Sequence, residues 1–385
     1  MIAYNKTYLQ NIRIQEQAKA AYTHNLISKD ENDTIHSKYQ VPFYTPNFFI
    51  RIGLFLLTVV IASFSFGLFA LIFMSAIENI IEGMTIFFAL AIYAALELVV
   101  QQKNHYQSGV DDALLWLSAT MLFAGISFSV NAGALANCVL AFVISFYATL
   151  RFADRVMSIA AYLALLGVIF FTFDQLGGIV KAVLPFILMA DSAAIYFGIN
   201  YFKQQPYLKN YDQCFSIIRI AALLSFYAAG NFYVVKELSS SMYHLPDDNN
   251  TPIPFGWLFW AFTFIIPISY IARGLQKKDA IFLRTGMLLI AAIVFTVRYY
   301  YAIAPPEVVM VIGGMVLLVI SYAITQYLKE PKFGFTNAVT HVENKEEKLQ
   351  IESLVIAETF SQQAAAETTK FGGGSFGGGG ASADF

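Results

Sequence analysis

The chain has 385 residues, of which 57% are hydrophobic and 13% are charged, and its mean hydropathy is +0.58. Soluble domains carry about 25% charged residues, so a water-soluble fold could not bury this much apolar surface. The formal net charge of -2 and the lack of a clustered basic stretch argue against nucleic-acid binding. The composition therefore indicates an integral membrane protein.

Residues 1–47 precede the first apolar run and predict a cytoplasmic helical segment. Thr7 to Tyr22 has apolar residues at helical spacing, and Ser28 with Glu31 matches a capping box that starts a second short helix. We expect a helical hairpin that is too small to have its own core and that docks on the membrane domain or on a partner. No cleavable signal peptide is visible, so the first span is expected to act as the insertion signal.

Ten apolar windows within residues 48–328 are long enough to cross a bilayer, since a hydrocarbon core of about 30 Å needs roughly 20 helical residues. Only Asn131, Ala132 and Gly133 separate the third and fourth windows, so a re-entrant pair stays open as an alternative to two spans. The sequence predicts an all-α polytopic transmembrane helix bundle of about ten spans. The windows cover approximately residues 49–74, 84–100, 113–130, 134–150, 156–173, 182–202, 216–235, 255–273, 281–301 and 308–328.

The distribution of lysine and arginine predicts the orientation, because positively charged loops remain in the cytoplasm. With the N-terminus inside, only Lys181, Lys236 and Arg298 lie on or near the outer side. We therefore expect a multi-pass protein of the inner (plasma) membrane with both termini in the cytoplasm. The longest outer connection, around residues 236–254, is interpreted as a solvated connector, because one histidine and two carboxylates are too few for a metal site.

Residues 329–385 predict a cytoplasmic tail. Pro331 ends the last helix, and the stretch from Val342 to about Thr368 is charged and Gln- and Ala-rich, with partial helical character expected. The glycine run from Phe371 onward predicts a flexible tether, because its backbone entropy opposes a fixed fold and it has little to bury.

Both ends of the chain also carry a resemblance. The run from Tyr8 to Gly53, in which NLISKDE leads to FYTPNFFIRIG, resembles uncharacterised bacterial multi-span inner-membrane proteins with a cytoplasmic helical segment before the spans. The ending GGGSFGGGGASADF is similar to the glycine-rich tails of some bacterial membrane-anchored proteins, although Ala383, Asp384 and Phe385 depart from the commoner Gly-aromatic ending. The resemblance implies a bacterial inner membrane and no particular activity.

The sequence lacks the motifs of membrane enzymes. None of the histidines falls within a predicted span, which argues against zinc-dependent intramembrane proteolysis. Tyr211 and Asp212 match half of an intramembrane aspartyl protease site, but no GxGD-like partner supplies a second carboxylate. Neither a GxSxG elbow nor a Walker-type loop is present. We expect no enzyme activity, no cofactor and no metal, and we interpret Cys138 and Cys214 as small apolar side chains.

Ionisable side chains within spans are costly, so each needs a pairing or a functional explanation. Glu97, Arg219 and Arg284 lie near the cytoplasmic ends of their predicted helices. At this depth a local pair costs little, and we predict a structural ion pair between Glu97 and either Arg219 or Arg284.

Asp191 is the candidate ligand or proton site. It lies ten residues after Lys181 and twelve before Lys203, or about 15 and 18 Å along an ideal helix, which places it near the bilayer midplane. We expect the side chain to face the bundle interior. A protonated Asp191 that only bonds a neighbouring helix, through Asn231 or a serine, remains the alternative.

Two function hypotheses follow. The leading one is a non-enzymatic scaffold, sensor or assembly component, surrounded by membrane lipids, that presents its cytoplasmic ends to a protein partner. The alternative is a transporter or proton-linked permease that uses Asp191 in a helix also carrying Pro185. The first five and last five spans show no self-similarity, although many transporters contain inverted repeats.

Overall fold

The computed structural model describes residues 2–73, 77–176, 179–243 and 254–300, with isolated positions between 308 and 326. These residues form α-helices, one short 3-10 helix (η2, Pro206–Tyr211) and one isolated β-bridge without strands. Nine of the helices are long and apolar enough to cross a membrane. The predicted all-α polytopic bundle is thus confirmed. Most of the tenth predicted window, residues 244–253 of the outer connection and the whole tail fall outside the described residues.

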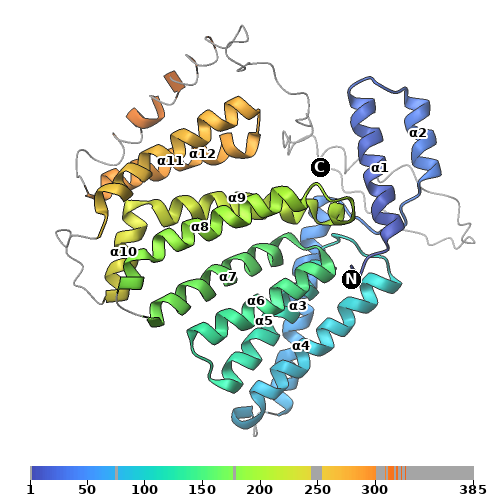
Figure 1. The fold of residues 1–385 in the computed structure, drawn as a ribbon. Helices are drawn as coiled ribbons and strands as arrows, with labels where there is room; N and C mark the ends of the chain where they lie inside the picture. The colour runs from blue at the N-terminus through green and yellow to red at the C-terminus, as the bar shows by residue number, and fades with distance from the viewer. Residues whose placement is uncertain are drawn as a thin grey trace, which may run out of the picture. The chain divides into compact units, whose positions relative to one another are not determined.

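The first two helices form a hairpin, seen at the upper right of Figure 1. Helix α1 (Lys6–Thr23) is capped by Asn5, and helix α2 (Lys29–Lys38) starts with the predicted capping box of Ser28 and Glu31. No residue of α2 is buried. We call these two helices, residues 6–38, the arm.

Consecutive spans pair as antiparallel hairpins, which follow one another in chain order across the bundle (Figure 1). The 21 residues of α5 and the 19 residues of α6 each qualify as a span, which favours two crossings over the re-entrant alternative. The pairs are α4 (Ile77–Gln102) with α5 (Val110–Val130), α6 (Ala134–Phe152) with α7 (Arg155–Leu176), α8 (Ile179–Phe202) with α9 (Asp212–Gly230), and α11 (Gly256–Lys277) with α12 (Ala280–Tyr300).

Helix α3 (Phe48–Ile72) lies at the edge of this arrangement. None of its residues is buried, and it packs more extensively against α5 than against α4, its neighbour in sequence. The rings of Phe55 and Trp116 meet edge to face with their centroids 5.3 Å apart. The first span is therefore held to the bundle by one side and exposes an apolar face on the other.

The α11–α12 pair depends on one close backbone approach. A Cβ atom on Gly274 of α11 would lie 2.7 Å from the backbone nitrogen of Leu283 in α12. Since real Cβ atoms do not come this close to backbone, only glycine permits the observed packing. Small residues at helix interfaces serve this purpose in membrane bundles.

The structure corrects the seventh span, for which the sequence predicts one helix over 216–235. Helix α9 begins earlier and ends at Gly230, and α10 (Phe232–Tyr243) starts after Asn231, whose backbone is extended. The Asn231 side chain accepts a hydrogen bond from the backbone N–H of Val234 at 3.3 Å. Asparagine is a favourable N-cap residue, so it starts a new helix within a continuous apolar run.

Asn231 also connects three helices. Its amide nitrogen donates to the Tyr227 hydroxyl at 2.9 Å and to Thr296 Oγ1 of α12 at 3.0 Å. Thr263 of α11 accepts from the backbone N–H of Phe232 at 3.0 Å. These polar side chains are buried and hydrogen-bonded, so the interruption of the helix at Asn231 carries little desolvation penalty.

Two hydrophobic cores stabilise the described part of the bundle. One surrounds Leu96, Leu115 and Phe152 in α4, α5 and α6, and it includes Tyr4 and Phe43, which precede the first span. The N-terminal segment is therefore part of a bundle core, as the docking prediction requires. The second core surrounds buried side chains of α9, α11 and α12, among them Leu223, Tyr270 and Leu289.

Candidate functional site

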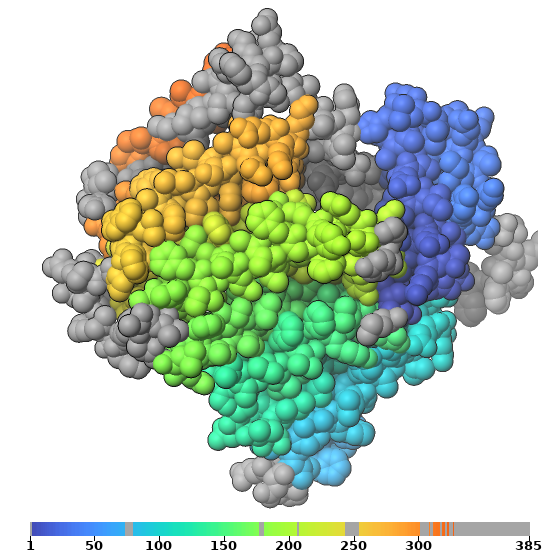
Figure 2. Space-filling model, in the orientation of Figure 1, coloured from blue at the N-terminus to red at the C-terminus, as the bar shows by residue number. Residues whose placement is uncertain are grey.

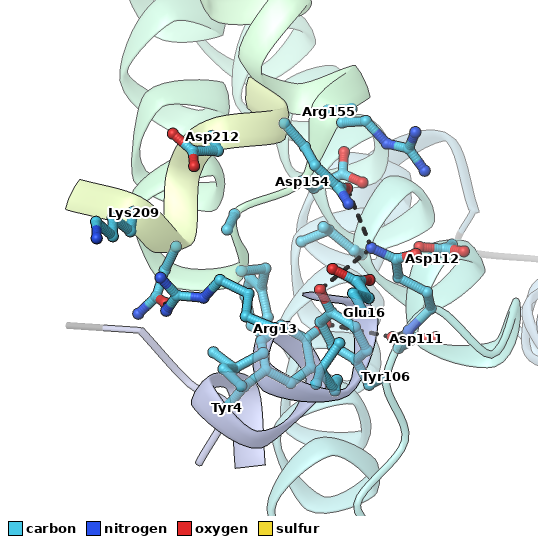
Figure 3. A pocket seen from close by; sticks show the side chains of 18 of the residues that line it. Tyr4, Arg13, Glu16, Tyr106, Asp111, Asp112, Asp154, Arg155, Lys209 and Asp212 are labelled. Atoms are coloured by element: carbon cyan, nitrogen blue, oxygen red, sulfur yellow. Dashed lines mark hydrogen bonds between the residues drawn. The ribbon is translucent and has the colours of Figure 1, made fainter. Parts of the chain in front are cut away.

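Charged side chains of both signs gather where the base of the arm meets the bundle. Figure 3 shows most of them around one space. They come from the arm and the residues before it, the α4–α5 connection and the start of α5, the α6–α7 connection, the start of α9 and its preceding segment, and, through Arg51, α3. The cavity between them has a volume of about 180 Å³. Its ionisable lining consists of the acids Glu16, Asp111, Asp112, Asp154 and Asp212, the bases Arg13, Arg51, Arg155 and Lys209, and the phenols Tyr4 and Tyr106. We call this site the charged joint.

Asp111 organises the joint from the first turn of α5. Its Oδ1 accepts hydrogen bonds from the backbone N–H and the hydroxyl of Ser108, at 2.8 and 2.9 Å. Its Oδ2 accepts from the backbone N–H of Gln107 at 2.8 Å and from the Tyr4 hydroxyl at 3.2 Å. The carboxylate is 2% exposed, yet both oxygens are bonded and the helix N-terminus stabilises the negative charge.

Gly109 allows the chain to turn into α5 at this point. Its φ of +89° lies in the region that side chains disfavour, and a Cβ atom there would lie 2.1 Å from the carbonyl oxygen of Arg51 in α3. The connection therefore packs directly on the α3 backbone. Beside it, Arg51 Nη2 and Asp112 Oδ2 form an ion pair at 2.6 Å.

Tyr4 anchors the arm to the bundle. Its ring is 8% exposed and meets the rings of Phe43, Tyr106 and Phe152 edge to face. The backbone N–H of Ala3 donates to the carbonyl oxygen of Arg151 at 2.7 Å. Burial, together with the nearby Asp111 carboxylate, raises the pKa of the Tyr4 phenol well above its usual value, so it remains a hydrogen-bond donor at physiological pH.

The arm also contacts the segment that leads into α9. Arg13 of α1 donates a hydrogen bond to the side-chain oxygen of Asn210. The adjacent Tyr211 donates to the Leu150 carbonyl oxygen at 2.7 Å, and Cys214 donates through its thiol to the Ala153 carbonyl oxygen at 3.1 Å. One network thus links the arm to the ends of α5, α6 and α9.

The size and charge of the joint limit its chemistry. Small-molecule sites have volumes of about 300–1,000 Å³, and this cavity is smaller. Among the described residues, no group of three or more His, Cys, Asp or Glu side chains could hold a metal ion. The mixture of acids and bases instead suits a contact that holds protein segments together.

His105, Ser108 and Asp111 resemble a catalytic triad in composition but not in arrangement. His105 Nδ1 lies 2.8 Å from Ser108 Oγ, and the same hydroxyl donates to Asp111. Since its single proton is directed at the carboxylate, the serine accepts from histidine and is not activated by it. Ser108 is also fully buried. The three residues therefore hold the α4–α5 connection in place.

Glu97 and Arg219 form ion pairs, but not with the partners predicted from sequence. Glu97 pairs at 2.8 Å with Arg151 of α6, not with Arg219 or Arg284. Arg219 pairs at 2.8 Å with Asp279, which lies between α11 and α12. Helices α4 and α6 contribute to the same core, whereas Arg219 and Arg284 lie on helices of the other core. Similar depth in the membrane therefore did not identify the partner of Glu97. Arg284 is exposed on α12.

Asp191 is half-buried in α8, and its Oδ2 atom is buried without a hydrogen-bond partner among the described residues. The next residue, Ser192, is fully buried and accepts a hydrogen bond from Tyr162 of α7 at 3.1 Å. Asn231, the partner suggested from sequence, is bonded to Tyr227 and Thr296 instead. A ligand or proton role for Asp191 stays a prediction.

Sequence reasoning missed most of the charged joint. Asp111 and Asp112 were placed outside the third span, which the sequence starts at 113, whereas α5 begins at Val110. Two adjacent acids at the start of an apolar helix are a usable signal, because a helix N-terminus favours negative charge. Tyr4 and Arg13 gave no comparable signal, since their partners lie far away in sequence.

Nine membrane-length apolar helices in the described residues, together with a polar joint at one end, define a multi-pass integral membrane protein. Comparison of the chain with protein families, with curated proteins and with solved structures gave no match.

Proposed function

We propose that the protein is a non-enzymatic scaffold or sensor of a bacterial inner membrane. In this proposal the arm, fixed to the bundle at its base, presents a binding surface to a protein partner. The observation that carries this proposal is the contrast between the two ends of the arm. Tyr4 and Arg13 fasten its base to the bundle, whereas α2 has no buried residue. On the face seen in Figure 2, the blue surface of the arm is exposed. A fixed polar hairpin outside the apolar spans presents a surface that lipid does not cover.

The charge distribution supports a cytoplasmic location for the arm. The arm itself carries Lys19, Lys29 and Lys38. The same end of the bundle carries basic residues in the α4–α5, α8–α9 and α11–α12 connections and in the helix ends that flank the α6–α7 connection. Positively charged segments near spans are retained in the cytoplasm. A partner is therefore expected there, among cytoplasmic proteins or the cytoplasmic parts of other membrane proteins.

Site-specific crosslinking in living cells tests the proposal. A photoreactive residue in place of Asp33, exposed on α2, should give a discrete adduct with one partner. The same residue in place of Phe64, which is 77% exposed on the apolar face of α3, should not give that adduct. Tyr4→Ala removes a buried aromatic anchor worth about 3–5 kcal/mol and should abolish the Asp33 adduct by releasing the arm.

Tyr22→Ala is the matched control, because Tyr22 is also an aromatic residue of this segment but is 41% exposed. This variant should keep the adduct. If photoreactive residues along α2 give no discrete adduct, or if Tyr4→Ala leaves the adduct unchanged, the arm does not present a partner surface in the proposed way.

A proton-linked permease is the second candidate, and the unpartnered Asp191 Oδ2 atom favours it. Such a carboxylate in a span is a functional hypothesis, because an unpaired ionisable group is costly there. Proteoliposomes containing the wild type should then take up protons with a co-substrate, and Asp191→Asn should stop the uptake. Unchanged stability and unchanged proton movement in Asp191→Asn would remove this candidate.

A further inference from the structure

A second cavity lies between α8, α9, α11 and α12, away from the charged joint. Its volume is about 950 Å³, near the upper end of the usual range for small-molecule sites, which is about 300–1,000 Å³. Its wall is rich in aromatic and aliphatic side chains, including Phe197, Leu223, Phe226, Tyr270 and Phe282. We call it the α8–α12 cavity.

The α8–α12 cavity is basic at one end and apolar along its depth. Lys203 at the end of α8 and Arg273 and Lys277 at the end of α11 line one end. Ser192, also in the lining, lies eleven residues before Lys203, or about 16 Å along an ideal helix. Phe197, between them, is 68% exposed, so the cavity opens on the outer surface of the bundle.

The ionic groups in the lining leave positive charge unmatched. Arg219 and Asp279 form an ion pair, and Asp279 is the only acid that lines the cavity in the described residues. No second carboxylate in the lining is left to pair with Lys203, Arg273 and Lys277. The Arg219 Nε atom is also buried without a hydrogen-bond partner among the described residues. The basic end thus has both net positive charge and an unused donor.

We propose that the α8–α12 cavity binds one anionic membrane lipid. The phosphate head group lies among Lys203, Arg273 and Lys277, and one acyl chain lies along the aromatic wall. Basic residues that only snorkel to the interface need no apolar cavity behind them. A soluble anion would leave the apolar wall without a contact, and a neutral lipid would leave the basic residues without a counter-charge. The cavity therefore fits a molecule that has both an anionic head group and an acyl chain. This inference does not depend on the function proposed for the arm.

Lipid binding by the purified full chain tests the inference. The protein in a neutral detergent is titrated with phosphatidylglycerol that carries a fluorophore on one acyl chain. We expect saturable binding of one lipid per chain. Unlabelled phosphatidylglycerol should displace the probe, whereas phosphatidylcholine with the same chains and soluble glycerol 3-phosphate should not. Displacement by phosphatidylcholine at equal concentration would overturn the role of the basic end.

Two pairs of variants locate the site. Ala193→Trp fills the cavity and should weaken binding at least about tenfold, or about 1.4 kcal/mol. Ala194→Trp is its control, because Ala194 is exposed on the same helix and does not line the cavity. Lys277→Gln should weaken binding, whereas Lys278→Gln, one residue further and also exposed, should not.

The variants Lys277→Gln and Lys278→Gln test the proposal even if Ala193→Trp does not fold. Both lysines are exposed, so their replacement leaves the packing of the helices intact. Equal weakening by Ala193→Trp and Ala194→Trp, or by both lysine variants, would mean that the probe reports on the micelle or on net charge. Either result, like unchanged affinity in Ala193→Trp and Lys277→Gln, would overturn the proposal.

Discussion

Asp111 and Gly109 decide how the chain enters α5. The carboxylate accepts four hydrogen bonds, and the glycine lies against the carbonyl oxygen of Arg51 with a positive φ. Both features are local in sequence but join three separate segments. Single substitutions here should therefore affect the whole N-terminal half of the bundle.

Gly109→Ala should destabilise the protein, because an alanine is strained at this φ and its Cβ atom would overlap the Arg51 carbonyl group. The combined cost is on the order of 2–4 kcal/mol. The thermal transition of the detergent-solubilised protein should fall clearly. Gly198→Ala is the control, since nothing lies within 4 Å of its added Cβ atom and alanine favours the helix. Equal transitions in the two variants would contradict the close packing at Gly109.

His105 predicts a pH dependence of stability. Burial lowers its pKa below the usual 6.5, against the opposing effect of Asp111. The folded state therefore binds the proton at His105 less readily than the unfolded state does. Protonation of His105 does not reduce the free energy of unfolding above about pH 6.5, and it lowers this free energy as the pH falls towards the folded-state pKa. Thermal transitions measured from pH 7.5 to 5.5 should fall more in the wild type than in His105→Asn, whose amide can still donate to Ser108. An equal fall in the wild type and in His105→Asn would contradict this role of His105.

At the scale of helices, the pairing of spans rests on specific contacts between neighbouring helices. A double-mutant cycle of Glu97→Gln and Arg151→Gln should give a coupling energy of about 1 kcal/mol, because the two half-buried groups bond directly. The same cycle between Glu97→Gln and Arg219→Gln should be additive within about 0.5 kcal/mol. Coupling in the second cycle and not in the first would reinstate the pairing expected from sequence.

How much of the architecture could be predicted depends on the kind of signal. Helix positions and the Ser28–Glu31 cap are local properties. The cap was predicted correctly, and so were the positions of the described spans apart from the seventh. The break at Asn231 was missed because apolar residues continue after it, and hydropathy does not register a cap. The partner of Glu97 and the residues of the charged joint depend on which helices lie side by side. A single sequence carries no direct measure of that distance.

For the molecule as a whole, the alternation of spans predicts which connections face the cytoplasm. With Cys138 and Cys214 replaced by alanine, a single cysteine at Asn131 should react with an impermeant maleimide in intact cells. Cysteines that replace Lys29 and Lys278 should react only after the membrane is permeabilised, because positively charged segments next to spans remain in the cytoplasm. Labelling of the Lys29 position in intact cells would reverse the proposed orientation and move the arm to the outer side.

The position of α3 has a consequence for biosynthesis. This helix leaves the ribosome before α4 and α5, but it packs mainly on α5, and its ion pair joins Arg51 to Asp112. It must therefore remain in the lipid, without its main partner, while α4 is inserted. Its lack of buried residues suits this interval, since a helix that is apolar on all sides is soluble in lipid before assembly. Arrival of α5 then brings the counter-ion of Arg51, and the ends of α3 and α5 become fixed at the same membrane depth.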